Sequence, residues 1–196
     1  MAPTGSPNEI FLHVRVIMAI VLGMSITRLL AGIAHFVQHP HKYKLYAVHL
    51  GWVAWMLLLA IHFWWWEFWL QTIVSWNFET YIFLITYAIL LYLLCALLFP
   101  DNIAEYSGYE EFFISRRKWF FGILACAFVF DYIDTWLKGR EHLETFGIEY
   151  MIRVPAYVVL CIVGMITPNR RFHLIFVGAS LIYQVSWILR QFNTLD

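Results

Sequence analysis

Charged side chains inside long apolar stretches are the residues of this chain best suited to chemistry. Two aspartates and two arginines fit that description, namely Arg28, Asp131, Asp134 and Arg153. Asp131 and Asp134 are three residues apart, which places both carboxylates on one face of a helix. A balanced layer of two acids and two bases either pins helices together or lines a path for an ion, a proton or a small polar solute.

The surroundings of these residues are strongly apolar. The chain has 196 residues, of which 62% are hydrophobic and 13% are charged, and its mean hydropathy is +0.68. An average soluble domain carries about 25% charged residues. So little charge indicates a polytopic membrane protein whose main partner is the lipid bilayer. The formal net charge of zero, without a basic patch, argues against nucleic acid as a partner.

Apolar segments divide the chain into regular lengths. Each is long enough, at about 20 residues, to cross a bilayer as a helix. We therefore predict a single all-α transmembrane domain over residues 1–196 with six helices, at 10–37, 44–72, 79–99, 117–137, 149–167 and 172–192.

Proline and tryptophan mark the ends of these segments. The first, third and fifth are followed by Pro40, Pro100 and Pro168, and the other three close with tryptophan and a polar residue. Because proline ends helices and tryptophan prefers the membrane interface, this pattern predicts three helical hairpins of one orientation.

Basic residues gather on one side of the predicted membrane. The first, third and fifth connections hold Lys42, Lys44, Arg116, Arg117, Lys118, Arg170 and Arg171. The opposite side holds Lys138, Arg140 and Arg190. By the positive-inside rule, the former connections face the cytoplasm and both termini face outward.

Depth along each helix, at about 1.5 Å per residue, groups the polar side chains into layers. The predicted buried network contains the four charged residues named first and, at similar depth, Thr86, Tyr87 and Gln184. An outer polar layer follows, with His62, Glu67 and Arg190. Glu67 comes directly after three tryptophans, Trp64 to Trp66, and is expected to be a carboxylate at the membrane boundary.

Helix one carries small residues at intervals of four, which allow a neighbouring backbone to approach closely. The stripe consists of Ala19, Gly23, Thr27 and Ala31. It predicts either a seam within the molecule or a contact between copies in a homo-oligomer.

Metal and cofactor motifs are weak in this sequence. His35 and His49 share an inner depth and could ligate one haem, but a polar histidine contact is the simpler interpretation. No motif of a hydrolase, a metalloprotease or a nucleotide-binding loop is present, so the sequence does not predict an enzyme.

Four stretches, GMSITRLLAGIAH (23–35), CALLFPD (95–101), SRRKWFFG (115–122) and YQVSWILR (183–190), resemble small six-helix bacterial integral membrane proteins. The resemblance implies a bacterial inner membrane and carries no function. From the residues, the favoured hypothesis is a transporter or gated channel with an outward-facing polar cavity. The alternatives are a structural or partner-binding membrane module and a haem- or quinone-linked redox protein.

Overall fold

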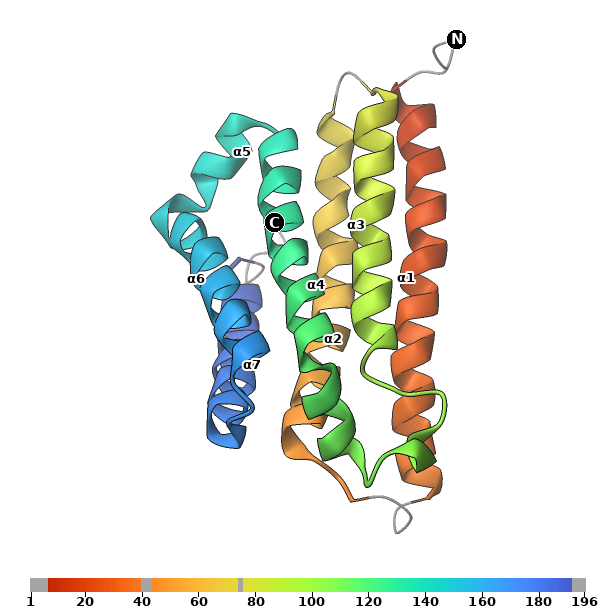
Figure 1. Cartoon of the computed structure of the whole chain (residues 1–196). Coiled ribbons are helices and arrows are strands. Elements are labelled where there is room, and N and C mark those ends of the chain that lie inside the picture. The colour runs from red at the N-terminus through yellow and green to blue at the C-terminus, as the bar shows by residue number, and fades with distance from the viewer. Residues whose placement is uncertain (1–6, 40–43, 74–75, 192–196) are drawn as a thin grey trace.

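The computed structural model describes residues 7–39, 44–73 and 76–191, and these ranges are helical without strands (Figure 1). Six of their helices are long and apolar enough to cross a membrane, which confirms the predicted all-α, multi-pass chain. The long helices are α1 (Pro7–Gln38), α2 (Ala47–Trp66), α3 (Phe78–Ala96), α4 (Tyr109–Leu137), α6 (Gly147–Ile166) and α7 (Arg170–Gln191). Shorter elements are the 3-10 helices η1 (Glu67–Thr72) and η2 (Ile103–Glu105) and the α-helix α5 (Arg140–Thr145).

The fourth long helix begins earlier than the apolar pattern predicts, at Tyr109 rather than at residue 117. Its first turn carries Glu110 and Glu111, and acidic side chains there are favoured by the helix dipole. Glu111 also accepts a hydrogen bond from the backbone N–H of Ser107 at 2.7 Å. These polar turns escape a search for hydrophobic residues, so the helix is longer than its apolar part.

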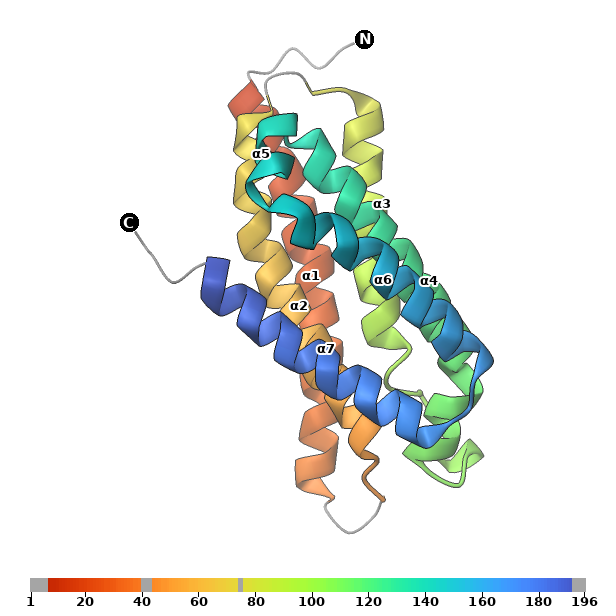
Figure 2. The same cartoon turned by 90° about the vertical axis from the view of Figure 1, so that its left-hand side faces the viewer.

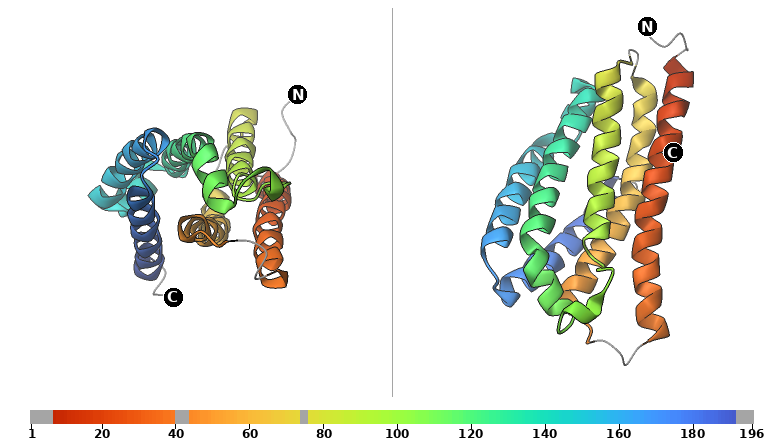
Figure 3. Two further views of the ribbon diagram at one scale, coloured as in Figure 1. Left: turned by 60° about the horizontal axis from the view of Figure 1, so that its bottom comes forward. Right: turned by 45° about the vertical axis from the view of Figure 1, so that its right-hand side comes forward.

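The most extensive helix packing does not follow the predicted hairpins, which would pair α1 with α2, α3 with α4 and α6 with α7. The most extensive contacts pair α1 with α3, α4 with α6 and α2 with α7. The right view of Figure 3 shows α1, α2 and α3 side by side, and Figure 2 shows α6 lying along α4 and α7 crossing obliquely over α2. The predicted arrangement in three hairpins is therefore not confirmed.

Two glycines allow these helix pairs to approach closely. A Cβ on Gly51 of α2 would lie 2.8 Å from a methyl carbon of Val177 in α7. A Cβ on Gly164 of α6 would lie 3.0 Å from the ring of Phe121 in α4. The seam between α2 and α7 thus requires a residue without a side chain at position 51, as small residues do in membrane helix pairs.

The small-residue stripe of α1 lies away from this packing. Gly23, Thr27 and Ala31 are exposed and Ala19 is half-buried, and a Cβ on Gly23 would meet no atom within 4 Å. α1 instead buries a different set of side chains, Val14, Met18, Leu22, Ser25 and Leu29. A contact between copies through the stripe stays a prediction.

Candidate functional site

A buried triad of charged side chains lies at the end of α4. Nζ of Lys138 donates to Oδ2 of Asp134 at 2.5 Å and to Oε1 of Glu67 at 2.9 Å. The exposed fractions of the side chains are 0% for Lys138, 1% for Asp134 and 4% for Glu67. Burial alone would lower the pKa of Lys138, but the carboxylates of Asp134 and Glu67 outweigh it and raise this pKa above its ordinary value.

The prediction that Glu67 is a boundary carboxylate rather than a buried one is wrong about burial, because its side chain is only 4% exposed. The α-helical part of α2 ends at Trp66 and the tighter helix η1 begins at Glu67. A 3-10 helix turns its side chains differently from an α-helix, so the face of Glu67 does not follow from the tryptophans before it. The carboxylate contacts Lys138, and a buried charge is tolerated when it has such a partner.

A second cluster surrounds Asp131, one turn before the triad on α4. Oδ2 of Asp131 accepts hydrogen bonds from Nη2 of Arg153 at 2.5 Å and from the Tyr150 hydroxyl at 3.0 Å. The Tyr87 hydroxyl of α3 donates to Oδ1 at 3.4 Å. The guanidinium of Arg153 also lies 4.7 Å from the ring centroid of Tyr150 and 5.1 Å from that of Trp187, in cation–π contact. This cluster joins α3, α4, α6 and α7.

A small cavity of about 30 Å³ connects this cluster to α2 and α7. Its polar lining consists of His62, Tyr87, Asp131, Arg153 and Gln184, and its apolar lining includes Trp55 and Phe128. Nδ1 of His62 lies 3.3 Å from Nε2 of Gln184. A polar space of this size is enough for a water molecule, since roughly 10–15 Å³ suffices for one.

Arg28 does not belong to this site, contrary to the prediction. Nη2 of Arg28 donates to Oδ1 of Asp101 at 2.5 Å and to the carbonyl oxygen of Phe99 at 2.9 Å. The prediction measures the depth of Arg28 from the end of α1, and α1 extends to Gln38. The partner helix α3 already ends at Ala96. The structure therefore places Arg28 beside the connection that follows α3, about ten residues or 15 Å from the end of its own helix.

The other predicted residues divide between the site and its surroundings. Thr86 donates its hydroxyl hydrogen to the carbonyl oxygen of Ile82 in its own helix at 2.8 Å. Arg190 of α7 makes two hydrogen bonds to Glu149 of α6, at 2.8 and 2.6 Å. Glu149 also accepts a hydrogen bond from Tyr183 at 3.1 Å. Arg190 thus closes the far end of the α6–α7 pair and does not line the cavity.

Sequence reasoning missed Lys138, Tyr150 and Glu149 as site residues. Lys138 and Glu149 each have a signal in the sequence. Asp134 with Lys138, and Glu149 with Arg153, are four residues apart and so share a helix face. Nothing in the sequence singles out Tyr150 among the chain's 11 tyrosines.

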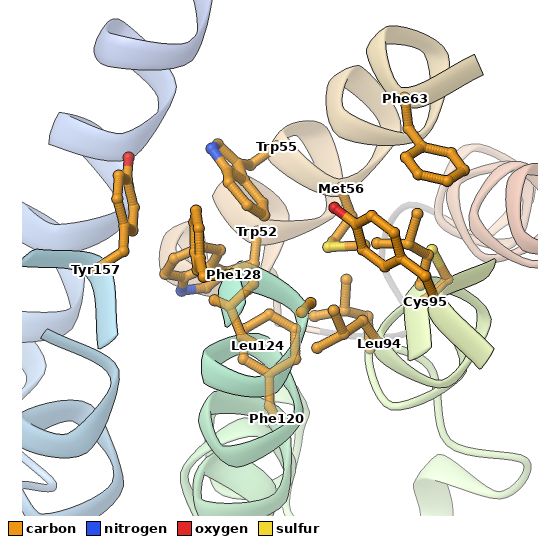
Figure 4. Packing of buried hydrophobic residues seen from close by; sticks show 14 of the residues in the cluster. Trp52, Trp55, Met56, Phe63, Leu94, Cys95, Phe120, Leu124, Phe128 and Tyr157 are labelled. Atoms are coloured by element: carbon orange, nitrogen blue, oxygen red, sulfur yellow. The ribbon is translucent and has the colours of Figure 1, made fainter. Parts of the chain in front are cut away.

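Aromatic rings fill the space between the cavity and the N-terminal ends of α2 and α4. The ring of Trp52 lies 5.2–5.6 Å, centroid to centroid, from those of Trp55, Phe120, Phe121 and Phe176. Figure 4 shows Trp52 and Trp55 facing Phe120, Leu124 and Phe128, with Tyr157 beside them. Trp52 and Phe120 are 0% and 1% exposed. We call the rings of Trp52, Trp55, Phe120, Phe121 and Phe176 the aromatic plug, and they close the site on that side.

The candidate haem ligands have other contacts. Nε2 of His49 lies 2.5 Å from the carbonyl oxygen of Leu98, and its ring packs against Phe99 and Tyr109. His35 contacts the ring of His39 at 5.0 Å. In the part of the chain that the structure describes, no group of three or more His, Cys, Asp or Glu side chains is arranged to hold a metal ion.

The site thus consists of two neighbouring parts. One is a small cavity lined by Asp131, Arg153 and hydrogen-bonding tyrosine, histidine and glutamine side chains. The other is the buried triad of Lys138, Asp134 and Glu67, one turn further along α4. The helices of the site are those of a multi-pass membrane protein. Comparison with models of protein families, with curated proteins and with solved structures finds no match.

Proposed function

We propose that this protein is a small membrane transporter that moves protons, or a solute coupled to protons, through the polar site around Asp131 and Asp134. The observation that carries the proposal is the charge balance of the two clusters. Glu67, Asp131 and Asp134 supply three carboxyl groups, whereas Lys138 and Arg153 supply two cations. With all five ionised, the site would bear one net negative charge.

A proton bound to one carboxyl group would restore neutrality. A net charge in a buried site is costly, and interacting carboxyl groups release their protons as a coupled set. Oε2 of Glu67 and Oδ1 of Asp134 are buried and have no hydrogen-bond partner among the described residues, so either oxygen can carry the proton. This excess of acid over base is what a proton-exchanging site needs.

The cavity suits a proton better than a larger solute. Its volume of about 30 Å³ admits water and a proton that travels along hydrogen bonds. His62, Tyr87 and Gln184 extend the hydrogen-bonding surface from Asp131 toward α2, α3 and α7. On the other side lies the aromatic plug, so transport requires a second arrangement in which those rings separate.

Proton flux into liposomes tests the proposal. Purified protein would be reconstituted with a pH-sensitive dye inside, and a potassium diffusion potential would drive the protons. We expect flux above that of empty liposomes and a clear loss with Asp134→Asn. The matched control is Asp101→Asn, which removes an ion-paired carboxylate that is 93% exposed and distant from the site. Unchanged flux with Asp134→Asn would remove that residue from the mechanism.

The competing function is a structural membrane module, and one observation favours it. Three polar contacts of the site also join two elements: Glu67 with Lys138, Asp131 with Arg153, and His62 with Gln184. Ion pairs of this kind can specify helix packing without any transport. Wild-type protein that gives no flux above empty liposomes would favour this function.

The proposed orientation places the basic connections in the cytoplasm of a bacterial inner membrane. Lys138 strengthens the charge asymmetry, because it is buried in the triad and is not a free basic residue of the opposite side. The positive-inside rule counts basic residues in loops. Of the residues used for that prediction, Lys42 lies outside the described residues.

Cysteine labelling tests the orientation. In a Cys126→Ala background, Glu141→Cys should react with an impermeant maleimide in intact cells. Ser107→Cys, on the opposite side, should react only after the membrane is permeabilised. The reverse pattern would overturn the orientation and leave the proton site untouched.

A further inference from the structure

A second hollow lies between α6 and α7, beside the proton site. It is a cleft of about 370 Å³, within the roughly 300–1,000 Å³ of typical ligand pockets. Its walls are largely apolar and include Ile152, Ala156 and Leu160 of α6 and Phe176 and Ala179 of α7. Ile152 and Leu160 are 59% and 38% exposed, so the cleft opens toward the surroundings of the helices.

The cleft exists because α6 and α7 pack on different partners, α4 and α2. Figure 2 shows the two helices running antiparallel along the outside of the bundle. At one end they are joined by the short link between Ile166 and Arg170. At the other end, the hydrogen bonds from Arg190 to Glu149 hold them together. The opening is therefore a lateral slot, bounded at both ends.

Among the polar groups that border this slot, Arg153 has a donor left over and also reaches the proton site. Arg153 lines both the cleft and the polar cavity, and its side chain is only 10% exposed. Asp131 accepts from its Nη2. Nε of Arg153 is buried and has no hydrogen-bond partner among the described residues. A ligand in the cleft that offers an acceptor oxygen would satisfy it.

We propose that the cleft binds one acyl chain of a zwitterionic phospholipid from the leaflet nearer the start of α6, with an ester carbonyl accepting a hydrogen bond from Arg153. The order of groups along α6 matches such a lipid. Glu149, paired with Arg190, comes first and complements an ammonium and a phosphate of opposite charge. Arg153 follows four residues or about 6 Å later, and the apolar walls at Ala156 and Leu160 come next. The site does not depend on proton transport.

The polar contact decides which molecule stays in the cleft. Lipid tails are as apolar as the walls, so burial gives no preference for the cleft over the bilayer. Packing in the slot and the hydrogen bond to Arg153 supply this preference for the cleft. We expect a roughly tenfold enrichment over lipid at an ordinary helix face, which corresponds to about 1.4 kcal/mol.

Photolabelling in reconstituted bilayers tests this site. The probe is phosphatidylethanolamine with a diazirine midway along one ester-linked acyl chain, and labelled peptides are identified by mass spectrometry. The α6 and α7 residues of the cleft should be labelled about tenfold more than the exposed α1 residues Leu12 and Val16, the factor expected from the enrichment above. Ala179→Leu, which fills the cleft, should abolish the excess. The matched control Ala34→Leu, an exposed alanine of α1, should not.

Two further arms keep the outcomes distinct. Ala156→Leu fills the cleft from the opposite wall, in case Ala179→Leu disturbs the fold. An ether-linked probe lacks the ester carbonyl and should lose most of the excess labelling. Equal labelling of cleft and α1 residues, or an excess that survives both leucine variants, would overturn the binding site. Equal excess with ester and ether probes would overturn the contact with Arg153.

Discussion

Two ion-paired regions of this molecule share their chemistry and differ in their surroundings. In the triad, Lys138 contacts Asp134 at 2.5 Å, and no side chain of the three is more than 4% exposed. Beside the end of α3, Arg28 contacts Asp101 at the same 2.5 Å, but their side chains are 36% and 93% exposed. Distance alone does not distinguish the two pairs.

Burial is what separates them. Water and salt screen a pair at the surface, so its net contribution to stability is small. A buried pair has lost its hydration, and each member depends on the other to offset that loss. Removing one partner therefore matters far more in the triad than at Arg28. The Asp131–Arg153 pair, with side chains 21% and 10% exposed, lies between these two cases.

The largest effect is expected from Lys138→Met. It leaves two buried carboxyl groups without their cation, and we expect a loss of about 3–5 kcal/mol in the free energy of unfolding in detergent. The triple variant Lys138→Met, Glu67→Gln, Asp134→Asn should recover much of this loss, because it removes the charges together. A loss below about 1 kcal/mol would mean that the triad behaves like a surface pair.

Asp131→Asn should have an intermediate effect. It removes the charged acceptor of Arg153 while keeping the shape of the side chain, and hydrogen bonds to charged groups contribute about 1.5–3 kcal/mol. Unfolding of the variant in detergent measures the loss. A loss as large as that of Lys138→Met would show that the two clusters act as one unit, which would break the graded comparison.

Alkaline pH should lower the free energy of unfolding by less than these two substitutions do. The pKa of Lys138 in the folded protein lies above its ordinary value of 10.5. The charge of Lys138 therefore stabilises the fold fully below pH 10.5 and progressively less as the pH rises through the higher folded-state pKa. Unfolding measured from pH 9 to 12 should show this loss in the wild type and not in Lys138→Met.

The sequence predicted the helices well, because membrane-spanning length and apolar composition are properties of single segments. It also predicted similar depths for Asp131, Asp134 and Arg153, and the structure brings Arg153 to Asp131. Depth along a helix needs only the rise per residue. What depth cannot supply is the direction in which a side chain points, or which helix lies opposite it.

Arg28 and Glu67 show what the sequence could not decide. Arg28 has its partner in the connection after α3, and that pairing depends on α1 extending past the end of α3. Glu67 is buried because the helix changes type at that residue and because Lys138, 71 residues away, lies opposite. A local sequence pattern predicts neither the relative lengths of two helices nor which helix packs against a given side chain.

The smallest effect is expected at the exposed pair, and Asp101→Asn is its cleanest test. Arg28→Gln would also remove the hydrogen bond from Arg28 to the carbonyl oxygen of Phe99, so its effect would mix two interactions. Asp101→Asn leaves that bond in place and removes only the carboxylate charge. We expect a change of at most about 1 kcal/mol, which should shrink further in high salt because the pair is open to water. The Lys138→Met effect should keep its size across the same salt range, since the triad is shielded from ions. If both effects fell equally with salt, the triad would be open to water in the protein, and burial would no longer explain the difference between the two regions.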